Sequence, residues 1–286
     1  MKQVRENNQK IVQELKKMAQ EEGEFPLLLQ FYRDLLRVQV EALENFTVPD
    51  SKISSQDVAR NQKKGLPLLD LSKLSLDWPQ LRKVFIKVTE IFTKYPQLFG
   101  EIPETLRQPS AKDFINRKTV DAWFTGNKLS AELPDSAISE GLLQSIIHAT
   151  LKPLLSAYAE SLIKLVDQEK WRRSYCPVCG GSPDIAYLDT ERGSRWLVCS
   201  RCDTEWLSQR LPCPFCGTEE QKKIVYYTDD AGKYRLYTCD QCKRYLKVID
   251  MSKADGEIPL PLERFRTIAL DAQAKEQGYH ASYLID

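Results

Sequence analysis

The sequence predicts an α+β protein: an all-helical N-terminal domain, two small rubredoxin-like or zinc-ribbon β modules, and a C-terminal helix. Two observations carry this prediction. All eight cysteines lie between Cys176 and Cys242, and the first 175 residues contain none. Apolar residues recur at helical spacing before this segment, whereas aromatic and β-branched runs of strand length fill it. We therefore expect four segments, with limits at residues 1–172, 173–210, 211–250 and 251–286.

The N-terminal segment is predicted to contain six or seven amphipathic helices separated by proline-containing loops. Asp77 is placed to cap one of them, and Pro79 is tolerated in its first turn. Ser110 is expected to precede another helix. The periodic stretches are residues 4–18, 27–46, 78–95, 111–124 and 138–165.

The last of these helices is expected to begin at Ser136 or Ser139. Pro153 lies inside it and is expected to kink it or split it in two, because proline cannot donate a backbone hydrogen bond. Residues 65–70 (GLPLLD) are apolar and contain a proline. We expect them to form an ordered loop packed on the helices.

The residue pattern of the cysteine-containing segment predicts short strands, with turn residues such as Asp230-Ala231-Gly232 between them. A further helical pattern covers residues 262–279, and Gly278 is a plausible stop signal. The expected strands are residues 184–188, 194–198, 223–227, 234–238 and 245–249.

Charge and composition limit the possible functions. Hydrophobic residues make up 42% and charged residues 28%, with a formal net charge of +1. A charge this close to zero gives no global field for nucleic acid or an anionic membrane. The N-terminus lacks the apolar core of a secretory signal, so we expect a cytoplasmic protein without membrane insertion. In a reducing compartment, cysteines are more often metal ligands or redox groups than disulfides.

All eight cysteines form CxxC pairs, and each pair can turn two sulfurs onto one ion. The chain repeats the order CPxCG, hairpin, CxxC, so the first pair is expected to join the second and the third to join the fourth. A cross-braced pairing is the less favoured alternative. Gly180 and Gly217 follow the CPxC pairs and permit positive φ. The pairs are Cys176/Cys179, Cys199/Cys202, Cys213/Cys216 and Cys239/Cys242.

Several chemistries suit these cysteines. A structural metal that replaces a core too small to form by itself is the main interpretation. Four thiolates bind zinc or mononuclear iron alike, and zinc is favoured by spacing alone. Redox use of the thiolates and binding of nucleic acid are the alternatives. Residues 173–250 hold twelve Lys and Arg against eleven Asp and Glu, which argues against nucleic acid.

The two histidines offer little further chemistry. His148 lies beside an apolar helical stripe and is expected to be a partly buried structural residue, and His280 is expected to be exposed. The sequence contains no GxSxG, phosphate-binding glycine loop or HExxH motif. No catalytic residues are therefore predicted, and we do not expect an enzyme.

The motifs together resemble the formate dehydrogenase accessory protein, or FdhE, family. The residues that carry the resemblance are GLPLLD at 65–70, YCPVCGGSPDIAYL at 175–188, CSRCDTEW at 199–206, CPFCG at 213–217, YYTDD at 226–230, CDQCKRYLKVID at 239–250, Leu270-Asp271 and Gly278-Tyr279.

The resemblance covers nearly the whole chain and implies a cytoplasmic assembly factor. Its expected partner is the catalytic subunit of a respiratory molybdenum- or tungsten-dependent formate dehydrogenase. The family is associated with iron in rubredoxin-like sites, which moves the expected metal from zinc towards iron. It also implies that all eight cysteines are ligands, four to each of two metal ions.

Overall fold

The computed structural model describes residues 2–21, 26–46, 53–71, 74, 76–129, 138–254, 256 and 259–281. Its contacts divide the chain into two compact units. The first, here called the helical unit, comprises Met1–Pro49 and Asp70–Tyr158. The second, the sheet unit, comprises Asp50–Leu69 and Ala159–Asp286. The four segment limits given above stay a prediction.

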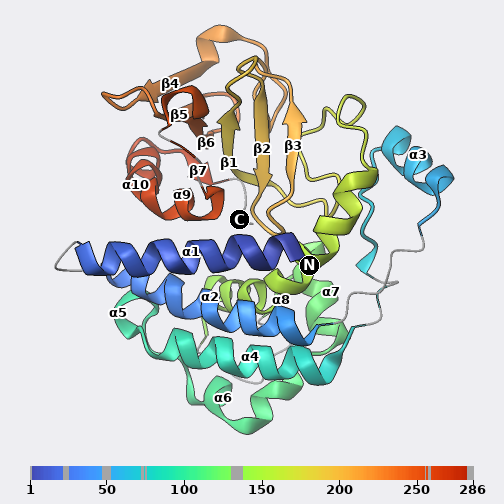
Figure 1. The fold of residues 1–286 in the computed structure, drawn as a ribbon, viewed down its shortest axis with the longest axis vertical. Coiled ribbons are helices and arrows are strands. Elements are labelled where there is room, and N and C mark those ends of the chain that lie inside the picture. The colour runs from blue at the N-terminus through green and yellow to red at the C-terminus, as the bar shows by residue number, and fades with distance from the viewer. Residues whose placement is uncertain are drawn as a thin grey trace. The chain divides into compact units, whose positions relative to one another are not determined.

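The helical unit has its core where α2 (Leu27–Asn45) packs against α4 (Trp78–Thr93), as Figure 1 shows. The ring of Phe31 lies 5.0 Å from that of Phe92 and 4.6 Å from that of Phe99 between centroids. Such tilted and edge-on aromatic pairs add to the stabilisation from burial. The other helices are α1 (Lys2–Glu21), α5 (Pro96–Phe99), α6 (Glu104–Arg107), the 3₁₀-helix Pro109–Phe114, α7 (Arg117–Thr125) and α8 (Glu140–Leu162), the last of which ends in the sheet unit.

Helix capping agrees with the sequence in part. The Asp77 carboxylate accepts from the Gln80 N–H at 3.0 Å, as predicted. The start predicted for the helix after Ser110 is wrong. A 3₁₀-helix occupies Pro109–Phe114, and α7 begins only after Asn116, whose side chain accepts from the Thr119 N–H. The extended backbone of Asn116 interrupts the helical pattern that the sequence periodicity carries through.

Pro153 lies inside α8 without splitting it. Proline leaves the carbonyl four residues earlier without its helical donor, which here is that of Ala149. The buried Gln39 side chain of α2 donates to this carbonyl at 2.8 Å. The Ser139 hydroxyl accepts from the Leu142 N–H at the start of α8, and the alternative cap Ser136 lies outside the described residues.

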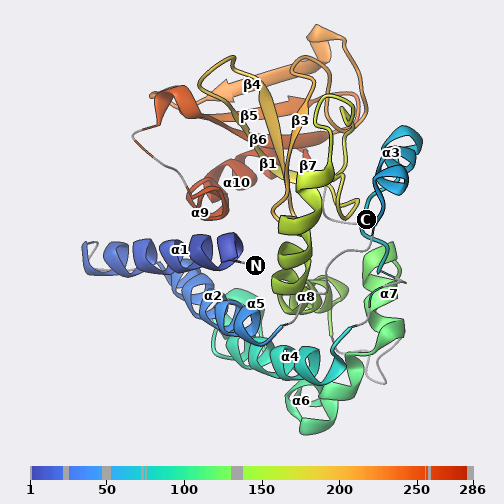
Figure 2. The ribbon, with the colours of Figure 1, turned by 45° about the vertical axis from the view of Figure 1, so that its right-hand side comes forward.

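The sheet unit contains one continuous sheet with the strand order β3-β2-β1-β6-β5-β4, and β7 pairs with β6 (Figure 2). Each cysteine repeat supplies three antiparallel strands, and β1 joins the two halves by pairing with β6 in parallel. The strands are β1 (Pro183–Leu188), β2 (Arg195–Cys199), β3 (Glu205–Ser208), β4 (Ile224–Thr228), β5 (Tyr234–Cys239), β6 (Arg244–Asp250) and β7 (His280–Ala281).

Two short helices cover one face of this sheet. Leu260 of α9 (Leu260–Arg266) packs on Ile185 and Ile249, and Ala274 of α10 (Ile268–Glu276) packs in a second cluster. The tail is therefore helical, but it is divided where the sequence predicts one continuous helix. At that point, the Thr267 hydroxyl donates to the Glu263 carbonyl at 2.6 Å, and the Thr267 N–H donates to the same carbonyl at 3.0 Å.

The GLPLLD loop lies beside the first cysteine pair. The Leu68 and Leu69 N–H groups donate to the carbonyls of Pro177 and Val178 at 2.9 and 2.8 Å. The backbone of this loop is therefore bonded to the CPVC turn, a contact that the sequence does not predict. The sheet unit also contains α3 (Ser55–Lys64), capped by the Ser54 hydroxyl. Across the described part of the chain, no helix is long and apolar enough to cross a membrane.

Candidate metal centres

The first four-cysteine group joins the first and second CxxC pairs. The Sγ atoms of Cys176 and Cys202 lie 3.7 Å apart, and that of Cys179 lies 3.4 Å from those of Cys199 and Cys202. All four side chains are buried, none more than 2% exposed. These separations are too long for disulfides and close to the roughly 3.8 Å that a tetrahedral site with 2.3 Å metal–sulfur bonds requires.

The second group joins the third and fourth pairs in the same way. The Sγ atoms of Cys213 and Cys242 are 3.8 Å apart, and those of Cys216 and Cys239 are 3.7 Å apart. Cys213 and Cys239 are buried, Cys242 is half-buried and Cys216 is exposed. Within the described ranges, these two groups are the clusters of at least three potential ligands that the structure brings together.

The two CPxCG turns are closed by the same backbone bonds. The Cys176 N–H donates to the Gly181 carbonyl, and the Gly180 N–H donates back to the Cys176 carbonyl. Equivalent bonds link Cys213 with Thr218 and Gly217. The turns therefore fix the sulfur positions through local backbone geometry.

The residue after the second cysteine has positive φ in all four turns. Gly180 and Gly217 have φ of 75° and 73°, as the sequence predicts, and Asp203 and Lys243 have 58° and 52°. The last two escaped the sequence reasoning because neither is glycine. Aligning the four CxxC pairs would have placed Asp203 and Lys243 at the position that Gly180 and Gly217 occupy. Gly180 has a second constraint, since a Cβ there would lie 3.0 Å from the Pro67 ring.

The thiols differ in their ease of ionisation. Hydrogen bonds from neighbouring thiols, together with burial, raise the pKa of Cys179 well above its usual value. Burial raises the pKa of Cys213 to about 11. For Cys216, burial opposes ionisation, but hydrogen bonding from the Thr218 backbone N–H and the other thiols outweighs it and lowers the pKa. The exposed member of the second group is therefore the easiest of these three to ionise.

Arg264 fixes the first group to the helices on the sheet. Its guanidinium donates to the Asp184 carboxylate at 2.5 and 3.0 Å, to the Asp203 carboxylate at 2.7 Å and to the Cys199 carbonyl at 3.0 Å. Charge-assisted contacts of this kind are shorter and stronger than neutral ones. Arg264 is 65 residues from Cys199, so no local sequence signal predicts this contact.

Arg195 reaches from the first repeat to the second group. It is 2% exposed, and its guanidinium donates to the Gln209 carbonyl and, at 2.9 Å, to that of Pro212, next to Cys213. Burial lowers its pKa to about 10, while the charge of Cys213 acts in the opposite direction. Arg195 also lines a 360 Å³ pocket together with Cys213 and Cys216. A metal tetrathiolate carries negative charge, so it would balance this buried cation.

Both groups fit a metal ion. Four convergent thiols at tetrahedral spacing suit zinc and mononuclear iron, and the donor set does not distinguish them. The first group is shielded from solvent, whereas the second opens to it through Cys216. The geometry of the two groups therefore suits one ion each, and solvent reaches the second group more easily than the first.

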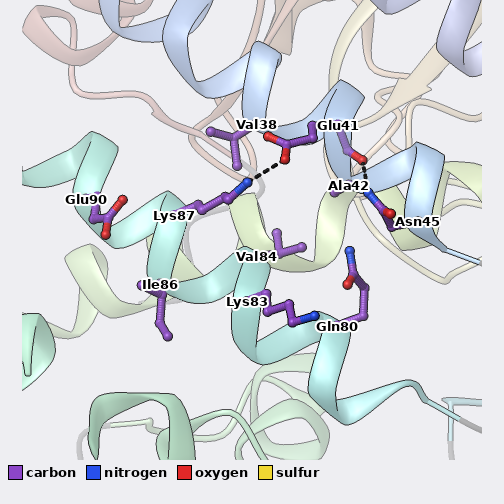
Figure 3. A pocket seen from close by; sticks show the side chains of 10 residues that line it. All are labelled: Val38, Glu41, Ala42, Asn45, Gln80, Lys83, Val84, Ile86, Lys87 and Glu90. Carbon is purple, nitrogen blue, oxygen red and sulfur yellow. Dashed lines mark hydrogen bonds and ion pairs between the residues drawn. The ribbon is translucent and has the colours of Figure 1, made fainter. Parts of the chain in front are cut away.

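The helical unit has a surface groove of its own. Figure 3 shows a 460 Å³ groove between α2 and α4, with Val38 and Val84 on its walls. The ion pair between Glu41 and Lys87, 2.5 Å long, spans it, and both side chains are about half exposed. An exposed ion pair of this kind contributes little stability. The groove shows no convergent set of buried polar groups that would define a ligand.

The histidines match the sequence interpretation. His148 is half-buried, and its ring stacks on that of Trp123 at 5.8 Å between centroids. His280 is exposed at the start of β7. Neither belongs to the cysteine groups.

The fold and the two groups thus define a class: a helical protein with a double four-cysteine sheet. A family model for the central domain of FdhE matches residues 175–210. An FdhE homologue from Aquifex aeolicus is 28% identical over 258 residues, covering 88% of this chain and 85% of its own. Protein FdhE from Escherichia coli K12 is 34% identical over 115 residues, covering 39% and 36%.

A solved structure shares the fold along nearly the whole chain. The crystal structure of the FdhE protein from Pseudomonas aeruginosa matches with a TM-score of 0.61 and 19% identity, covering 97% of this chain and 92% of that one. Together these matches confirm the resemblance drawn from the cysteine motifs. The chain is thus similar to FdhE proteins along nearly its whole length.

Proposed function

We propose that this chain is a cytoplasmic accessory protein that binds the catalytic subunit of a respiratory formate dehydrogenase and supports its maturation. The observation that carries the proposal is the pair of complete four-cysteine groups on one sheet, in a chain similar to an FdhE homologue over 88% of its length. The chain acts by binding and has no catalytic residues of its own.

Each group holds one metal ion, zinc or iron, through four thiolates. The ligands are Cys176, Cys179, Cys199 and Cys202 at the first site, and Cys213, Cys216, Cys239 and Cys242 at the second. The ion supplies a rigid tetrahedral link between hairpins whose own cores are small. In iron form it also supplies a one-electron couple, and the exposure of Cys216 favours the second site if electrons are exchanged.

Metal analysis of protein purified without oxygen from its own host, with partners retained, tests the sites. Two ions per chain are expected in the original protein, and one ion per chain in the Cys216→Ser variant. Iron with a reversible thiolate absorption band would favour electron transfer, and zinc alone would exclude it. A content below one ion per chain contradicts the site assignment.

Co-purification with the catalytic subunit tests the partner. Cys216→Ser should reduce association while the circular dichroism of the helical unit is unchanged. Gln241→Ala is the matched control, because Gln241 is exposed within the CDQC turn and is not a ligand. Full formate dehydrogenase activity in a deletion strain would refute the accessory role. Salt-sensitive binding of RNA or DNA would support a nucleic-acid ribbon in its place.

A further inference from the structure

The 360 Å³ pocket beside the second four-cysteine group holds more arginine than its own acids can neutralise. Arg172, Arg173 and Arg195 line it, and Glu219 supplies the one carboxylate among the described lining residues. Glu219 is exposed and forms no ion pair within the described part of the chain. Arg172 already has an acid, because its guanidinium donates to the Glu169 carboxylate. Arg173 and Arg195 are therefore left without one.

Arg195 is the deeper of these two residues and leaves most of its donors unused. It is 2% exposed, and its Nη2 donates to the carbonyls of Gln209 and Pro212. Its Nε is shielded from solvent without a partner, and no hydrogen bond to a described residue uses its Nη1. A buried cation with unpaired donors costs free energy, which a bound anion would offset.

Arg173 is held at the pocket by packing rather than by an acid. Its guanidinium carbon lies 5.5 Å from the centroid of the Trp171 ring, and a Cβ on Gly65 would lie 2.6 Å from that carbon. The Trp171 indole donates to the Tyr175 carbonyl at 2.8 Å, and the Tyr175 hydroxyl donates to the Gly65 carbonyl at 2.7 Å. The Nε of Arg173 is buried without a partner. The guanidinium is therefore placed before any ligand arrives, which lowers the entropy cost of binding one.

We propose that this pocket binds an oxyanion, a carboxylate or a phosphate, held by the guanidinium groups of Arg173 and Arg195. The N–H groups of a guanidinium form a planar fork that pairs with two oxygens of such a group at once. Thiolates at the loaded second group offset the charge of Arg195, so Arg173 contributes most of the net attraction. Two sources share this chemistry: a free anion, and an acidic side chain of a bound polypeptide.

Isothermal titration calorimetry of the full-length, metal-loaded chain tests the site, at constant ionic strength because salt screens exposed charge. Inorganic phosphate is the probe for a free anion, and a short peptide with one glutamate and blocked ends is the probe for a side chain. At least one probe should bind saturably at a single site, and the one that binds identifies the source. The measurement needs no client, so its outcome is separate from that of the accessory role.

Arg173→Gln should weaken binding of that probe about tenfold, because it removes a charge-assisted hydrogen bond. Arg192→Gln is the matched control, since Arg192 is an exposed arginine of the same unit that does not line the pocket. Its affinity should equal that of the original chain. Unchanged metal content and circular dichroism show that each variant is folded.

A variant that gains affinity separates binding from misfolding. Glu219→Gln removes the acid that competes for the arginines, so it should tighten binding about threefold, the size of one exposed charge pair. The proposal is overturned if neither probe binds the original chain, or if Arg173→Gln and Arg192→Gln bind the probe equally well. Should Arg173→Gln fail to fold, Glu219→Gln decides alone, and binding that is no tighter overturns the proposal.

Discussion

The contact between Gln39 and α8 gives a sharp test of the helical unit. Replacing Gln39 with Met keeps the side-chain volume but removes the donor to the Ala149 carbonyl. Pro153 already denies that carbonyl its helical partner, and Gln39 is only 5% exposed. A buried acceptor left without a donor costs about 1–3 kcal/mol, so Gln39→Met should lower the free energy of unfolding by that amount.

Pro153→Ala provides the matched control. Alanine restores an N–H four residues after Ala149, so the double variant should recover most of the lost stability, with a coupling energy of about 1–2 kcal/mol. Urea unfolding followed by far-ultraviolet circular dichroism measures all four proteins, because the long helices α2, α4 and most of α8 lie in the helical unit. If Gln39→Met lowers the free energy of unfolding by the same amount whether residue 153 is Pro or Ala, Gln39 does not replace the helical donor that Pro153 lacks.

Three further outcomes follow from buried charge, exposure and ionisation. A chelator should remove the metal of the second group first, with release stopping near half, because Cys216 is exposed and the first group is not; equal rates would contradict this. Arg195→Met should speed metal loss from the second group about tenfold by removing its buried counter-charge, whereas the exposed Arg192→Met should not. Burial and the Asp34 carboxylate raise the pKa of Tyr95 to about 12, above its unfolded value. Stability should therefore fall as pH rises from 10 towards 12, and Tyr95→Phe should abolish that part of the decline.

The cysteine groups were predictable from the sequence because their geometry is local. Two sulfurs on one CxxC turn and a hairpin between turns fix which pairs meet, and positive φ at Gly180 was predictable for the same reason. The joining of both repeats in one sheet was not, since the pairing of β1 with β6 links residues more than sixty positions apart. Arg264 and Gln39 act at similar or greater separation. The apolar periodicity also predicted a helix that runs through Asn116. The structure instead starts α7 after Asn116, because the Asn116 side chain caps that helix.

The join between β1 and β6 has a consequence for growth of the sheet. It sets the first strand of one repeat beside the third strand of the other, a head-to-tail contact that by itself never closes. A further molecule could extend the array indefinitely by placing its β3 against an open β4, as a fibre does. Gln168 occupies one backbone donor of the β3 edge through its bond to the Leu207 N–H. This glutamine thus takes up a donor that an added strand at this edge would need.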